Sequence, residues 1–162
     1  MHFDYINCKF LHRYNDARKL VDAELGEGYF SEHLEVIDHA WMSFAGKLVA
    51  WASVVVEGYV GILKCVVVHP DYRGKGIAKE LTKIRMQYLK DQGCKYVRSY
   101  AWVRPDGSCP SCSILEKNGF EVVKDVEGYY DSYKHSCPFC DKVVNVLLEF
   151  TRRSYNETRD AC

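Results

Sequence analysis

The chain has 162 residues, 48% of them hydrophobic, which is enough to build one domain with a complete core. Lysine plus arginine and aspartate plus glutamate each number 22, so no net charge directs the protein toward nucleic acid. No apolar run approaches the roughly 18 residues of a membrane span, and the first residues lack the pattern of a secretory signal. We therefore expect a soluble, cytoplasmic protein with no nucleic-acid or membrane partner.

The first part of the chain predicts two helices followed by a hairpin. Asn15 and Asp16 are typical helix-capping residues, and apolar residues then recur at helical spacing until the glycines at 26 and 28. A short second helix is expected at 32–37. The period then changes to that of strands at 40–45 and 48–56, which a two-residue turn beginning with Gly46 joins.

The middle of the chain predicts a strand, a turn, a helix and a second strand. The strand at 62–68 ends in a continuous apolar run, which favours burial on both faces. After the turn, apolar residues recur at helical spacing as far as Gly93, a residue that suits the end of a helix. A strand follows at 96–103, and two strands joined by a crossover helix are expected to lie parallel.

The last part of the chain predicts one more helix and two strands. Pro110 suits the first position of a helix over 110–118, and a glycine follows the end of that helix. Strands are expected at 120–123 and 143–151, joined by a long connection that is rich in tyrosine. Residues 152–162 look like a polar tail.

The turn between the middle strand and its helix has the features of a phosphate site. Its sequence is Arg73-Gly74-Lys75-Gly76-Ile77-Ala78, and its glycines allow backbone amides to approach a ligand closely. The N-terminus of the helix that follows carries unpaired N–H donors and a partial positive charge, which suit a pyrophosphate. The alternative is an ordinary helix-start turn whose basic residues are solvated.

The pattern Val-x-His-Pro-x-Tyr-Arg-Gly-x-Gly-x-Ala at 67–78 resembles the acyl-CoA-binding motif of the GNAT superfamily of N-acyltransferases. The predicted order of elements is similar to that of the family as well. The resemblance implies an α/β (α+β) fold with a mixed, mostly antiparallel central sheet, a splayed parallel strand pair and helices on both faces. We expect one such domain over 1–151, with 152–162 as its tail.

The same resemblance implies where acetyl-CoA would bind. Val66 and Val68 would offer main-chain groups to the pantetheine arm, and Arg73, Gly74, Lys75, Gly76, Ile77 and Ala78 would surround the pyrophosphate. Ser108 occupies a position at which relatives often have a CoA-binding asparagine, and Ser111 matches a small residue of the family. The family transfers acetyl directly from the thioester to an amine, so the protein positions the reactants, removes a proton and stabilises the oxyanion.

Two catalytic positions depart from the family's pattern. Leu115 stands where many relatives have a tyrosine that protonates the leaving thiolate, and no carboxylate occupies the usual position of the base at 62 or 64. We expect Glu57 to substitute as the base, directly or through a water, although a strand-end charge is often only solvated. Tyr130 is the candidate proton donor, and its alternative is a packing role.

The expected acceptor is a primary amine of a small molecule, protein or peptide. The cost of removing a proton from that amine indicates which kind of amine is favoured. Neutralising a lysine amine of pKa ~10.4 at pH 7 costs roughly 4–5 kcal/mol, whereas an α-amine of pKa near 8 costs only about 1 kcal/mol. A weak base therefore favours the less basic amine. We expect a monomer or a homodimer.

Two CxxC pairs suggest a structural zinc site. Cys109, Cys112, Cys137 and Cys140 have the paired spacing of a four-thiolate site, and four thiolates leave no open position for water. Zinc would join the start of the helix at 110–118 to the long connection between the last two strands. It would stabilise the fold more than a disulfide within one CxxC pair does. Internal disulfides, a redox dithiol and unrelated buried thiols are the alternatives.

A function of another class is also compatible with this sequence. The missing tyrosine and base would suit a non-catalytic, zinc-stapled binding module built on a degenerate acyltransferase fold. The intact phosphate turn argues against it, because a protein that does not bind CoA has no need of such a turn.

Overall fold

The computed structural model describes residues 4–7, 14–34, 37, 39–102, 107–125 and 147–153. Its helices and strands are, in chain order, β1 (Asp4–Asn7), α1 (Tyr14–Leu25), α2 (Tyr29–His33), β2 (His39–Phe44), β3 (Leu48–Glu57), β4 (Val60–Val68), a 3-10 turn (Pro70–Tyr72), α3 (Ile77–Asp91), β5 (Tyr96–Trp102), α4 (Pro110–Lys117), β6 (Glu121–Asp125) and β7 (Leu147–Arg153).

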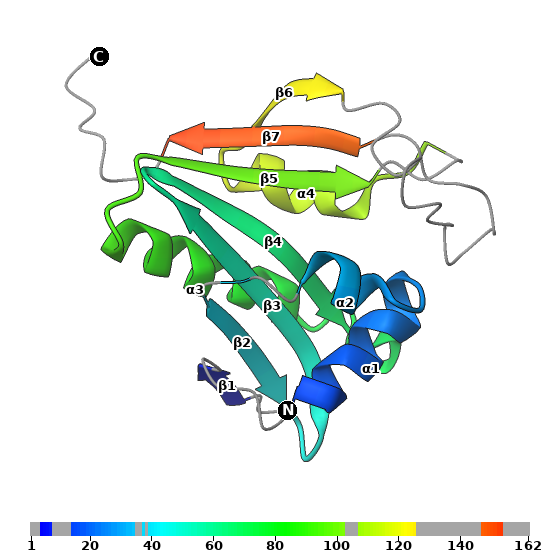
Figure 1. Cartoon of the computed structure of the whole chain (residues 1–162). Helices are drawn as coiled ribbons and strands as arrows, with labels where there is room; N and C mark the ends of the chain where they lie inside the picture. The colour runs from blue at the N-terminus through cyan, green and yellow to red at the C-terminus, as the bar shows by residue number, and fades with distance from the viewer. Residues whose placement is uncertain are drawn as a thin grey trace.

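The strands form one seven-stranded sheet in the order β1-β2-β3-β4-β5-β7-β6. Among the described strands, β4 and β5 pair in parallel and the other neighbours pair antiparallel. The crossover between β4 and β5 is α3, as the strand-helix-strand pattern predicts. Figure 1 shows β4 and β5 diverging from one another toward the end at which α1 and α2 lie. The predicted mixed sheet with a splayed parallel pair is therefore confirmed.

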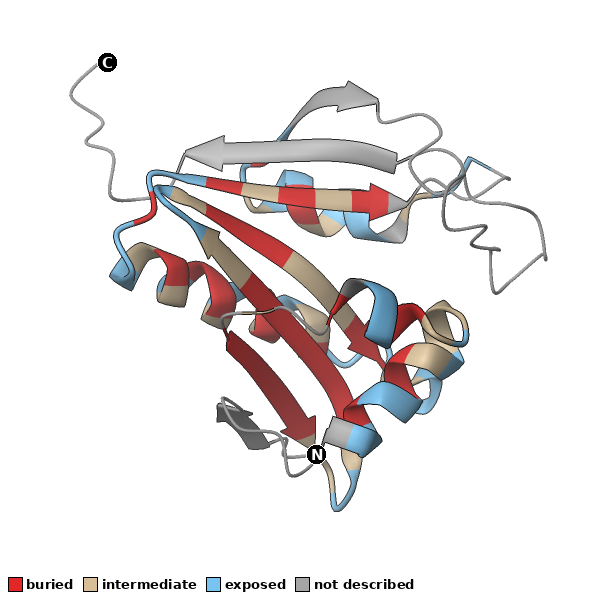
Figure 2. Ribbon diagram, viewed as in Figure 1, coloured by how far each residue is buried: buried red, intermediate tan, exposed pale blue. Residues whose placement is uncertain are grey.

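Helices cover both faces of the sheet and create two separate cores. On one face, Trp41 of β2 and Ala52 of β3 belong to a cluster with Leu81 and Leu89 of α3. On the other face, the intervening residues of the same strands, such as Trp51, pack with α1 and α2. In Figure 2, most of β2 and the middle of β3 are buried, as expected for central strands covered on both faces.

Several predicted ends of elements coincide with the structure. Pro110 is the first residue of α4, and Gly119 follows it with a φ of 84°. Gly93 follows α3 with a φ of 81°, and the amide of the next residue, Cys94, donates to the carbonyl of Leu89 at 3.1 Å. These are the positions at which a left-handed residue ends a helix.

Other boundaries differ from the prediction. The second helix is α2 at Tyr29–His33 rather than 32–37, because Phe30 is fully buried and its ring lies 5.2 Å from that of Trp51. The short strand β1 was not predicted. Strand β7 extends to Arg153, so it includes the first residues of the predicted tail. No helix in the described ranges is long and apolar enough to cross a membrane.

Candidate active site

The divergence of β4 from β5 begins at one definite point. The two strands pair from Val60 with Tyr96 to Leu63 with Ser99, and β5 then continues beside β7 as far as Trp102. Strand β4 also continues to Val68, but with β3 as its neighbour. The part of β4 that follows Leu63 therefore has one edge that is not paired with β5, and it can offer main-chain groups to a ligand.

The glycine turn lies at the end of this open stretch. Gly74 and Gly76 have φ values of 73° and 81°, a conformation that favours glycine, and a Cβ built on either would meet no atom within 4 Å. The turn is therefore open to solvent, and its glycines are required by backbone conformation rather than by close packing. The first bond of α3 is donated by Glu80 to Gly76, which leaves the preceding amides of the helix without an intrahelical acceptor.

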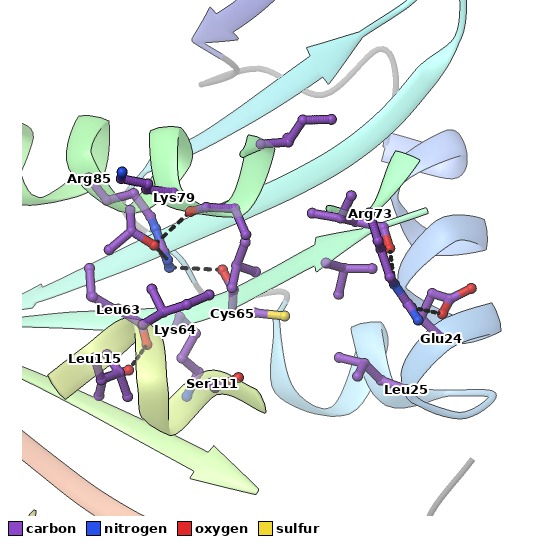
Figure 3. Close-up of a pocket in the computed structure, with 18 of the residues that line it drawn as sticks. Glu24, Leu25, Leu63, Lys64, Cys65, Arg73, Lys79, Arg85, Ser111 and Leu115 are labelled. Atoms are coloured by element: carbon purple, nitrogen blue, oxygen red, sulfur yellow. Dashed lines mark hydrogen bonds and ion pairs between the residues drawn. The ribbon is translucent and has the colours of Figure 1, made fainter. Parts of the chain in front are cut away.

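Arg73 connects the turn to two other elements. Its Nε donates to the carbonyl of Val68 at 3.1 Å, and its Nη2 donates to the carboxylate of Glu24 on α1 (Figure 3). Glu24 is the one carboxylate among the described residues that line the cavity. In this conformation, that carboxylate is paired with a cation and is not available as a base.

A cavity of about 550 Å³ extends from the glycine turn to the region where β4 and β5 diverge. Its walls come from the end of α1, the start of α2, β4, β5, the 3-10 turn, the glycine turn, α3 and the first turns of α4. The lining residues are Glu24, Leu25, Tyr29, Leu63, Lys64, Cys65, Val66, Val67, Val68, Tyr72, Arg73, Gly74, Gly76, Ile77, Ala78, Lys79, Thr82, Arg85, Ser99, Tyr100, Ser111, Ile114 and Leu115. A volume of this size is typical of cofactor and small-molecule sites.

Two groups in the cavity wall, the partly buried Cys65 and the buried Arg85, have shifted pKa values. Burial raises the pKa of the Cys65 thiol from 9.0 to about 12, and the nearby Arg85 cation lowers it by a smaller amount. Burial lowers the pKa of Arg85 from 12.5 to about 10, which leaves the guanidinium charged at neutral pH. Cys65 is therefore a neutral thiol at neutral pH.

Most of the residues predicted to bind CoA do line this cavity. They are Val66, Val68, Arg73, Gly74, Gly76, Ile77, Ala78 and Ser111. Lys75, in the middle of the turn, and Ser108, before α4, are exposed and lie outside the cavity wall. The sequence did not identify Glu24, Thr82 or Arg85, because these residues belong to helices whose faces become known only when they pack.

The two catalytic candidates have different outcomes. Glu57 is an exposed residue that pairs with Val60 in the β3–β4 hairpin, and it is not part of the cavity wall. Since the cavity begins at Leu63, the structure does not bring Glu57 to the open part of β4. Tyr130 lies outside the described residues. Leu115, at the family's tyrosine position, does line the cavity and has 5% exposure.

The predicted zinc ligands are not brought together in the described part of the chain. Cys109 and Cys112 are joined by a disulfide at the start of α4, so in this state they are not two free thiolates. Cys137 and Cys140 lie outside the described residues. Among the described residues, no group of three or more histidine, cysteine, aspartate or glutamate side chains could hold a metal ion. The zinc site is thus not shown.

The sequence model of the acetyltransferase (GNAT) family matches residues 5–120, which is more than half of the chain. The protein therefore belongs to the GNAT acetyltransferase family. A comparison with curated proteins finds no match.

Solved structures agree on the fold. An IAA acetyltransferase from Bacillus cereus aligns with a TM-score of 0.76 and 12% identity, over 94% of this chain and 99% of its own. The ribosomal-protein-S18-alanine N-acetyltransferase from Escherichia coli aligns with a TM-score of 0.73 and 15% identity, over 97% and 98%. A GNAT acetyltransferase from Elizabethkingia anophelis with acetyl-CoA bound aligns with a TM-score of 0.73 and 13% identity, over 93% and 97%.

Proposed function

We propose that this protein is an acetyl-CoA-dependent N-acetyltransferase. The observation that carries the proposal is one continuous cavity, which extends from the left-handed glycines of the turn to the edge of β4 that is not paired with β5. Backbone amides at the turn suit a pyrophosphate, and the unpaired edge of β4 suits the amide-containing arm that follows it. Related folds solved with CoA or acetyl-CoA bound support this assignment.

The proposed reaction is direct transfer. The nitrogen of a neutral amine attacks the thioester carbonyl and forms the carbon–nitrogen bond, and the carbon–sulfur bond breaks. The nitrogen loses one proton to water, and the leaving CoA thiolate takes up one proton, so the products are the amide and the free thiol. The chain contributes mainly by fixing the donor beside the acceptor and by excluding water. Glu24 is the one carboxylate of the described cavity wall, and it is paired with Arg73, so this wall offers no free carboxylate as a base.

Without a free carboxylate in the described cavity wall, an acceptor of modest basicity is favoured. An α-amine loses its proton at pH 7 at a cost of roughly 1 kcal/mol, against about 4–5 kcal/mol for a lysine side chain. Among the similar folds, one acts on the alanine of ribosomal protein S18 and another was solved with a Gag peptide and CoA. We therefore place a peptide α-amine ahead of a lysine side chain, with small-molecule amines as the other class to test.

Calorimetric titration with CoA tests the donor site. Gly74→Val places a branched side chain at the turn and should weaken CoA binding by at least about tenfold. Gly46→Val is the matched control, because Gly46 has a similar φ of 75°, an equally open surrounding and no place in the cavity wall. Equal affinity in the two variants would contradict the proposed pyrophosphate site.

A second candidate is a binding module without catalysis, and Leu115 in the cavity wall is the observation that favours it. The leucine has no proton to give to a leaving thiolate. Release of free thiol from acetyl-CoA separates the two functions when it is measured with peptides bearing free α-amines, peptides bearing only lysine amines, and small primary amines. CoA binding without thiol release from any of these acceptors would favour the binding module.

The cysteine pairs add a structural proposal. When reduced, Cys109 and Cys112, whose Cα atoms lie 5.3 Å apart, would offer two thiolates at the start of α4 to a zinc ion shared with Cys137 and Cys140. Protein purified under reducing conditions without added metal should then contain one equivalent of zinc and lose it when all four cysteines become serine. Full thiol titration in metal-free native protein would contradict this site.

A further inference from the structure

Arg85 of α3 contacts β4 at the point where the regular pairing of this strand is interrupted. We propose that Arg85 is a positioning residue: it holds the open part of β4 so that the acyl end of CoA is placed correctly in the cavity. The inference rests on the proposed function, because it concerns the donor that this cavity would bind.

The regular pairing of β4 is interrupted on both of its edges at the same place, directly after Leu63. Against β3, Ser53 pairs with Cys65 while the next residue, Val54, pairs with Leu63, so Lys64 is an extra residue and forms a β-bulge. Against β5, the pairing ends at Leu63 with Ser99. A bulge redirects main-chain groups, and the segment that it redirects here lines the cavity.

Arg85 supplies the hydrogen-bond donors that the interrupted ladder lacks. Its Nη1 donates to the carbonyl of Cys65 at 3.0 Å and to the carbonyl of Ser53 at 3.3 Å, and these two residues are partners across the bulge. Figure 3 shows the guanidinium reaching from α3 toward the main chain at Cys65. One side chain therefore fixes both strands at the bulge.

A second set of bonds fixes the guanidinium itself. Its Nη2 donates to Oγ1 of Thr82 at 3.2 Å, and that hydroxyl donates to the carbonyl of Ala78 at 2.8 Å. Ala78 is the last residue of the glycine turn, where the pyrophosphate is expected. The chain of bonds therefore links the two ends of the donor site. The arm of CoA would extend between these two fixed points.

The energetics indicate that Arg85 is present for geometry rather than for stability. Its side chain has 2% exposure, and within the described residues no carboxylate pairs with it and no acceptor bonds its Nε. Burial lowers its pKa to about 10, which reflects the cost of removing the charge from water. An apolar side chain would avoid that cost, but it could not bond the two carbonyls at the bulge.

Hydrogen exchange measured by mass spectrometry tests this role with CoA itself as the probe. In the wild-type protein, CoA should slow exchange both in peptides covering 62–68 and in peptides covering 73–78. In Arg85→Met, CoA should still slow exchange at 73–78 but lose at least half of its effect at 62–68. The affinity for CoA should fall no more than about threefold, because the pyrophosphate site is unchanged.

Three further variants make the outcome specific. Arg85→Lys should restore part of the protection at 62–68, since an ammonium can bond one or both carbonyls, and Thr82→Val should show a partial loss. Leu89→Ala is the control, because it weakens the packing of the same helix but removes no hydrogen bond at the bulge. In this variant, CoA should slow exchange at 62–68 as much as it does in the wild-type protein. Arg85→Lys and Thr82→Val also cover the case in which Arg85→Met does not fold.

Two outcomes would overturn the inference, and they differ from failure of the function. Protection at 62–68 that survives in Arg85→Met would show that the bulge needs no arginine. Equal losses in Leu89→Ala and Arg85→Met would show a general packing effect. No CoA-dependent protection in the wild-type protein would instead overturn the proposed function, and the inference with it.

Discussion

Arg73, in the turn before α3, donates a hydrogen bond to the carboxylate of Glu24 on α1, 49 positions earlier in the sequence. The pair crosses from one wall of the cavity to another and joins the predicted phosphate turn to a helix on the opposite face of the sheet. The Arg73 side chain is 45% exposed and that of Glu24 16% exposed, so the pair is open to screening by solvent.

Glu24→Gln should therefore strengthen CoA binding by about threefold. The substitution removes a negative charge near the expected pyrophosphate and releases Arg73 from a competing partner, and partly exposed pairs of this kind are worth roughly 0.2–1 kcal/mol. Calorimetry at low and high salt checks this, and the gain should shrink at high salt. Glu27→Gln, an exposed residue outside the cavity wall, is the control for net charge. Weaker CoA binding in Glu24→Gln would show instead that Glu24 orients Arg73 for the ligand.

Gly61 provides a test of the packing between β4 and α3. A Cβ added to this buried residue would approach the side chain of Leu89 to 2.6 Å, well inside normal contact. Gly61→Ala should therefore lower the free energy of unfolding by about 1–3 kcal/mol through overpacking. Urea denaturation of the purified protein measures this change.

The double variant identifies the cause. Leu89→Ala alone should cost about 2–5 kcal/mol because it leaves a cavity in the core. Combined with Gly61→Ala, it removes the clash, so the double variant should be more stable than the sum of the two single losses indicates. Strict additivity would mean that Leu89 does not cause the effect of Gly61→Ala.

These residues show what the sequence could predict and what it could not. The strand, glycine turn and helix from 62 to 91 are close in sequence, so their local signals predict both these elements and the proposed donor site. Arg85 and Glu24 were missed because their partners, the Cys65 carbonyl and Arg73, come from other elements. Glu57 was chosen as a base from its place at a strand end, but the hairpin places it outside the cavity wall.

Cys65 should be unreactive at neutral pH although it lines the cavity. Its pKa is raised to about 12, so the folded thiol stays protonated where an unfolded one ionises above pH 9. The stability that Cys65 contributes is therefore complete below pH 9 and is lost as the pH rises from 9 toward 12. Alkylation by iodoacetamide, followed at the peptide containing Cys65, should still be accelerating at pH 10. The alkylation rate of a tripeptide thiol should already level off there, and a plateau for Cys65 near pH 9 would contradict its raised pKa.

Leu115 offers a direct test of whether the leaving thiolate limits the rate. Its side chain is 5% exposed and lines the cavity, so Leu115→Tyr would bring a hydroxyl to that wall. The sequence resemblance implies a tyrosine at this position in many relatives. General acid catalysis commonly contributes about 10²–10⁴-fold, and we expect kcat of Leu115→Tyr to exceed that of Leu115→Phe by at least about tenfold. The phenylalanine variant is the control, because both rings impose the same overpacking and differ only in the hydroxyl. Thiol release from acetyl-CoA with the best peptide α-amine gives both values. Equal kcat in the two variants would mean that thiolate departure is not limited by its proton, and that solvent already supplies it.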